Sequence, residues 1–139
     1  MKKILKFLLY VFSAYHIVLG LIGVLFVGNA ELVKKMVAMV FNFNLTMDAQ
    51  AIWMLKPIAA YMLIMGIIAF FAAQKPSAHK SIIYAIAVLV LIRSIQRIFF
   101  ALQGNEFLLN ADPIRNIVVI VCLFIYGGSI LLINAKNGN

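Results

Sequence analysis

Residues 7–27, FLLYVFSAYHIVLGLIGVLFV, contain no aspartate, glutamate, lysine or arginine. A helix of about 20 apolar residues is long enough to cross the hydrocarbon core of a bilayer, which is roughly 30 Å thick. The basic start, Met1–Lys6, resembles that of a signal peptide, but the apolar segment exceeds the roughly 7–15 residues typical of one. We therefore expect this segment to be retained as a first transmembrane helix.

Three further apolar segments follow, at about residues 49–73, 81–102 and 113–134. The whole chain is 65% hydrophobic and 12% charged, whereas soluble domains are roughly 45–50% apolar and about 25% charged. A soluble domain of this size could not hide so much apolar surface, because much of its area faces water. The sequence therefore predicts an all-α fold, in which residues 1–139 form a single domain, an integral membrane four-helix transmembrane bundle.

Two proline positions bear on where the spans begin. Pro57 either opens the second membrane helix or kinks a longer one. Asp112-Pro113 is a typical capping and first-turn pair for the fourth helix. The connections after the second and third spans are short, so sequential helices are expected to be antiparallel neighbours.

The longer first connection carries a pattern of its own. Apolar residues recur at helical spacing between positions 32 and 41, beside Glu31, Lys34 and Lys35. This pattern predicts a short amphipathic helix lying in the membrane interface. The alternative is an outward extension of the first span.

The charged residues divide between two sides of a four-span chain. One side receives a set of lysines from the two ends and the second connection: Lys2, Lys3, Lys6, Lys75, Lys80 and Lys136. The other side receives all four acids: Glu31, Asp48, Glu106 and Asp112. Because cytoplasmic loops are enriched in lysine and arginine, we expect a protein of the cytoplasmic (inner) membrane of a bacterium, with both termini in the cytoplasm. The net charge of +8 then reflects topology and contacts with anionic lipids. No nucleic-acid partner is expected, since no basic stripe lies beside stacking aromatic residues.

The third span contains the strongest candidate site. Arg93, Gln96 and Arg97 are spaced to share one helix face, and ionisable residues inside a membrane are costly and often functional. Lys56 and Asn116 begin neighbouring spans at the same end. We predict a net-basic chamber in the outer half of the bundle. Its ligand would be anionic, or a carbonyl-rich head group such as that of a quinone or phospholipid, because arginine suits such oxygens.

A purely structural interpretation is also open. Both arginines could pair with Asp48, Glu106 or Asp112 and hold the helices together, or their side chains could extend outward to the interface. His16 in the first span could relay a proton or bind a cofactor, or be a buried histidine hydrogen-bonded across a helix interface. It shares a face with Ser13, Gly20 and Gly23, small residues that let membrane helices approach closely.

The chain shows no catalytic signature. Cys122 is the single cysteine, so no redox pair can form within the chain, and no His-Glu-x-x-His metal motif is present. We therefore expect no catalytic residues, no metal and no cofactor beyond a bound quinone or phospholipid. The leading hypothesis is a non-catalytic accessory or assembly subunit that contacts membrane lipids and other integral membrane subunits. The alternative is a quinone- or anionic-lipid-binding protein with a basic pocket.

Three features resemble the DoxX-like group of small bacterial four-span membrane proteins. These are the run from His16 to Gly23 before a short outer segment (29–48), the basic residue Lys56 opening the second span, and IRSIQR at residues 92–97 late in the third. The similarity covers about the first 110 residues. Some members look like membrane subunits associated with quinone-linked sulfur oxidation, and many have no known activity. The resemblance implies a basic outer-half pocket or an accessory-subunit role, and it transfers no catalytic residue.

Overall fold

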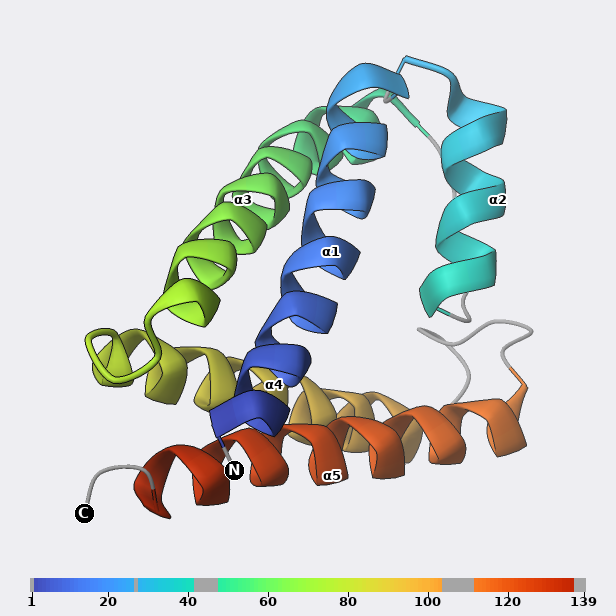
Figure 1. The fold of residues 1–139 in the computed structure, drawn as a ribbon. Helices are drawn as coiled ribbons and strands as arrows, with labels where there is room; N and C mark the ends of the chain where they lie inside the picture. Colours follow the sequence, from blue (N-terminus) through green and yellow to red (C-terminus); the bar gives the residue numbers. More distant parts are fainter. Residues whose placement is uncertain (1, 27, 42–47, 104–111, 137–139) are drawn as a thin grey trace.

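The computed structural model describes residues 2–26, 28–41, 48–103 and 112–136, which form five α-helices. These are α1 (Lys2–Phe26), α2 (Ala30–Phe41), α3 (Ala49–Gln74), α4 (Lys80–Leu102) and α5 (Pro113–Lys136) (Figure 1). Four of them, α1, α3, α4 and α5, are long and apolar enough to cross a membrane. The all-α class and the four predicted long apolar helices are thus confirmed. Pro57 lies inside α3 and does not open it.

α1 and α3 form an antiparallel pair whose backbones approach closely at small residues (Figure 1). A Cβ added to Gly20 would lie 2.5 Å from the backbone nitrogen of Leu63, and one added to Gly66 would lie 2.7 Å from that of Ile17. The Ser13 hydroxyl donates a hydrogen bond of 2.8 Å to the carbonyl oxygen of Gly66. The small-residue face expected on the first span is therefore the face that packs on α3.

α4 and α5 form the second antiparallel pair (Figure 1). Gly127 faces α4, since a Cβ there would lie 3.0 Å from Cγ of Leu91. The buried Ser94 hydroxyl donates to the carbonyl oxygen of Ile120 at 3.0 Å. Because this bond joins the middle of α4 to the middle of α5, it fixes the register of the pair.

The two helix pairs cross steeply and do not form one bundle with parallel axes (Figure 1). Between the pairs, α1 touches α5 and α3 touches α4 over much smaller areas than the helices share within a pair. The buried core at the crossing combines large side chains of α1 and α4 with three alanines of α3: Leu5, Leu9, Phe12, Ile83, Ile86, Ala69, Ala72 and Ala73. The glycines that permit backbone contact lie within the pairs, so each pair is joined more closely than the pairs are to each other.

A short helix, α2, follows α1 in the chain and is a separate element from it. Asn29 separates the two helices, and its side-chain oxygen accepts a hydrogen bond of 3.1 Å from the backbone nitrogen of Leu32. α2 then folds back beside α1 (Figure 1). Val33 and Val37 are buried. A guanidinium nitrogen of Arg115 donates to the carbonyl oxygen of Met39, which ties the last turn of α2 to the first turn of α5.

The outer surface of the four long helices is apolar. Only 17–28% of the residues in their most apolar windows are buried, and large side chains such as Leu25 and Leu102 are 70% and 77% exposed. Exposing apolar surface to water costs about 25 cal/mol per Å², whereas lipid imposes no such cost. The surface and the helix lengths together point to a multi-pass membrane protein.

Gly20→Val should lower the free energy of unfolding by about 1–3 kcal/mol, because the added side chain overlaps the α3 backbone and the pair must separate. Gly128→Val is the matched control, since a Cβ at Gly128 meets nothing within 4 Å. Thermal unfolding in detergent, followed by circular dichroism, measures both. Equal melting temperatures for the two variants would contradict the close α1–α3 contact.

Candidate functional site

His16 lies in α1 and is 3% exposed. Its Nδ1 is 2.9 Å from the carbonyl oxygen of Phe12, one turn earlier, and the Phe12 ring stacks on the imidazole at a centroid distance of 3.8 Å. A carbonyl oxygen can only accept, so Nδ1 carries the proton. The other ring nitrogen, Nε2, then has a lone pair available for a donor.

Arg93 supplies that donor from α4. Its Nη1 lies 3.3 Å from Nε2 of His16, and because a guanidinium can only donate, the imidazole accepts and is neutral. The side chain is half-buried. This bond joins one helix pair to the other. In the part of the chain that the structure describes, the polar partner of Arg93 is a neutral ring and not a carboxylate.

Further polar groups surround this bond. Tyr15 lies within electrostatic range of Arg93 and Arg97, and Arg97 lies within range of Arg115 of α5, whose like charge repels it. We call Tyr15, His16, Arg93, Arg97 and Arg115 the arginine cluster. It joins α1, α4 and α5, and Arg115 extends it to α2 through the Met39 carbonyl. The cluster is net basic, and its guanidinium groups can donate hydrogen bonds to oxygen atoms of a ligand.

The residues predicted for the basic chamber are only partly brought together. His16, Arg93 and Arg97 lie in the arginine cluster. Gln96 is exposed, whereas Arg93 and Arg97 are half-buried, and it is not part of the arginine cluster. Lys56 is exposed near the start of α3, which contributes no residue to the arginine cluster.

Asn116 follows Arg115 directly and is 4% exposed. Its Oδ1 is buried and accepts no hydrogen bond from the described residues. A buried amide oxygen without a donor costs free energy.

Two of the predicted ion-pair partners serve as helix caps. Oδ1 of Asp48 accepts a hydrogen bond of 2.7 Å from the backbone nitrogen of Ala51 at the start of α3. Oδ1 of Asp112 accepts one of 2.9 Å from that of Ile114 at the start of α5, as the Asp112-Pro113 pair predicts. Both carboxylates also lie where the helix dipole favours negative charge. Glu106 lies outside the described residues.

Sequence reasoning did not single out Ser94 or Tyr15. Ser94 is fully buried and continues the buried positions Ile83, Ile86 and Val90 at helical spacing, so a closer reading of that period could have found it. Tyr15 is adjacent to His16, and neighbouring residues on a helix point in different directions. Its approach to α4 depends on how the two helix pairs cross, which no local pattern predicts.

The charged groups of the arginine cluster are guanidiniums, which act only as hydrogen-bond donors. Across the described ranges, no three His, Cys, Asp or Glu side chains come close enough to hold a metal ion together. The arginine cluster can bind and orient an oxygen-bearing group through charge-assisted hydrogen bonds.

His16→Phe should destabilise the protein by about 1.5–3 kcal/mol, because a half-buried guanidinium loses its acceptor. His16→Gln, which keeps an acceptor on a flexible side chain, should recover part of this loss. His79→Phe is the matched control, since His79 makes no side-chain capping bond at the start of α4. Thermal unfolding in detergent gives the comparison, and an equal effect of the two Phe substitutions would argue against the Arg93–His16 contact.

Comparisons with known proteins give no match: no protein-family model fits the chain, and no curated protein or solved structure matches it.

Proposed function

We propose that the chain is a non-catalytic multi-pass membrane protein that binds the oxygen-bearing head group of a membrane-soluble molecule, a quinone or an anionic lipid. The binding site is the arginine cluster, with Arg93 as the principal donor. The observation that carries this proposal is that the positive charge of Arg93 faces a neutral imidazole. A charge within a membrane helix is costly, and an anionic or carbonyl oxygen would offset part of that cost.

The expected topology puts this site on the outer side. Both termini and the α3–α4 connection are assigned to the cytoplasm of a bacterial inner membrane, because these segments carry the lysines. Arg93 is thirteen residues beyond Lys80, which corresponds to roughly 20 Å along α4 at about 1.5 Å per residue. It therefore lies beyond the middle of the span, in the outer half.

The roles of the residues follow from their contacts. His16 holds one edge of the Arg93 guanidinium, which leaves its other N–H groups to form a fork for two ligand oxygens. Arg97 adds a second positive charge on the same side of α4. Tyr15 is 41% exposed, so its hydroxyl can contribute a hydrogen bond from the open side of the cluster. Any redox chemistry of a bound quinone would come from a partner protein.

Arg93→Gln should reduce the bound ligand at least tenfold, because a charge-assisted hydrogen bond contributes about 1.5–3 kcal/mol. Native mass spectrometry of the full chain, loaded in separate arms with an isoprenoid quinone and with phosphatidylglycerol, measures the occupancy. Lys56→Gln removes one charge outside the cluster and should leave the occupancy unchanged.

Arg93→Lys keeps the charge but loses the fork, so its occupancy should fall between those of wild type and Arg93→Gln. The ligand class is the one, quinone or anionic lipid, whose occupancy falls more in Arg93→Gln. If wild type and a folded Arg93→Gln variant show equal ligand occupancy in both arms, the proposal is wrong.

A second candidate function, an accessory or assembly subunit of a larger membrane complex, is favoured by the outer face of α5. Gly128 lies between Ile125 and Leu132, which are 64% and 63% exposed, and a Cβ at Gly128 would meet nothing within 4 Å. A small residue on an exposed apolar face permits the backbone of another helix to approach. The resemblance to DoxX-like proteins supports the same role.

Gly128→Leu should abolish recovery of a partner subunit from native membranes in mild detergent, while the melting temperature of the chain stays unchanged. Val118→Leu is the matched control, because Val118 is 54% exposed on the same helix and already carries a branched side chain. If both variants retain a partner seen with wild type, or if wild type is recovered only as a free monomer, the subunit role is excluded.

A further inference from the structure

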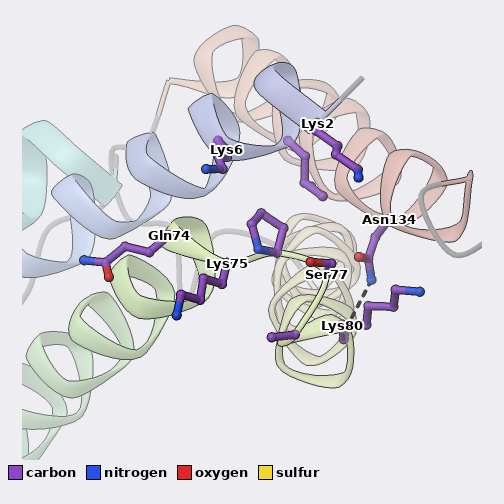
Figure 2. A pocket seen from close by; sticks show the side chains of 10 residues that line it. Lys2, Lys6, Gln74, Lys75, Ser77, Lys80 and Asn134 are labelled. Carbon is purple, nitrogen blue, oxygen red and sulfur yellow. Dashed lines mark hydrogen bonds between the residues drawn. The ribbon is translucent and has the colours of Figure 1, made fainter.

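A cavity of about 280 Å³ opens at the end of the molecule where α1 begins and α3 leads into α4 (Figure 2). Four lysines from three parts of the chain line it: Lys2 and Lys6 of α1, Lys75 of the α3–α4 turn and Lys80 of α4. This cavity is separate from the arginine cluster. It therefore does not depend on the function proposed above.

Hydrogen bonds stabilise the α3–α4 turn and the start of α4, which line this cavity. In the α3–α4 turn, the backbone nitrogen of Ala78 donates to the carbonyl oxygen of Lys75 at 3.0 Å. The amide of Asn134, a residue 1% exposed, donates to the carbonyl oxygen of Lys80 at 3.1 Å (Figure 2). The end of α5 is thus fastened to the start of α4. These hydrogen bonds hold the backbone of Lys75 and Lys80 in place, while the long lysine side chains can still change rotamer.

The described residues that line this cavity carry positive charge only. Its lining contains four lysines and no aspartate or glutamate. Figure 2 shows the labelled lysine side chains extending in different directions, and a bound anion would offset the repulsion between their like charges if they turned toward it. The start of α4 adds to the positive potential, because His79 makes no side-chain capping bond and the first amides of a helix favour an anion.

We infer that this cavity binds a phosphate-bearing anion through Lys2, Lys6, Lys75 and Lys80. The Ser77 hydroxyl, which also lines the cavity, provides a further hydrogen-bond donor. The volume lies at the lower edge of the roughly 300–1,000 Å³ of small-molecule sites, so it fits a phosphate head group and not a bulky cofactor. The phosphate can belong to an anionic lipid or to a soluble phosphate compound, and the two share the same chemistry.

Lys6→Gln/Lys75→Gln is the variant that tests the site, because these lysines come from two different elements and neither is fully buried. The full chain in neutral detergent is titrated with phosphatidylglycerol in one arm and with inorganic pyrophosphate in the other, and native mass spectrometry gives the affinity. We expect the affinity to fall at least tenfold in whichever arm shows binding. Binding in the lipid arm alone identifies a lipid, and binding in the pyrophosphate arm alone identifies a soluble phosphate compound. Equal binding in both arms shows that the phosphate group itself is what the site recognises.

Lys3→Gln/Lys136→Gln is the matched control. It removes the same charge from the N-terminal start of α1 and the C-terminal end of α5, yet neither lysine lines the cavity, so the affinity should change less than twofold. An equal loss in the two double variants would show that binding follows net charge, and it would overturn the site, as would an absence of binding to wild type in both arms. Should the first variant fail to fold by circular dichroism, Lys2→Gln/Lys80→Gln replaces it with the same expected loss.

Discussion

A guanidinium inside an apolar helix needs a polar partner, and Arg93 finds one on the other helix pair. Its bond to His16 depends on the hydrogen bond that the other ring nitrogen of His16 makes within α1. The Phe12 carbonyl fixes the proton on Nδ1, and this leaves Nε2 as the acceptor that Arg93 requires. The guanidinium of Arg93 has a hydrogen-bond acceptor, but the imidazole does not neutralise its positive charge. A site that is hydrogen-bonded and still positively charged can hold its shape while retaining affinity for an oxygen-bearing ligand.

Local patterns in the sequence predicted the parts of the structure that depend on neighbours along the chain. The four long helices follow from hydropathy, the cap at Asp112 from the Asp-Pro pair, and the glycine face of α1 from its spacing. For Gln96 and Lys56, local patterns did not predict which residues lie in the arginine cluster. Helical spacing put Gln96 on the face of Arg93, yet Gln96 is exposed and Arg93 half-buried. Which side of α4 meets α1 depends on how the pairs cross, which is a tertiary contact. Lys56 shares an expected depth with the arginines but lies on α3, the long helix that contributes no residue to the arginine cluster.

The acids illustrate the same limit. A carboxylate and an arginine assigned to one end of a bundle suggest an ion pair, yet a helix N-terminus competes for the carboxylate with several orphan backbone donors. Asp48 accepts from the backbone nitrogen three residues later, a bond that needs no other helix. Local hydrogen bonds of this kind form at little entropic cost, because the two residues are already close in the chain.

The steep crossing of the helix pairs (Figure 1) requires strongly tilted helices if all four long helices span a membrane. α1 and α3 contain 25 and 26 residues, so at about 1.5 Å per residue they are roughly 37–39 Å long. A helix of that length crosses roughly 30 Å of hydrocarbon with a tilt of up to about 35–40°. α4 and α5, with 23 and 24 residues, reach roughly 30–34° on the same argument. Opposite tilts of the two pairs therefore allow crossing angles up to about 65–74° with every helix still spanning. Away from the crossing, the pairs diverge, so helix faces that would be covered in a parallel bundle are left for lipid, for α2 or for a partner helix.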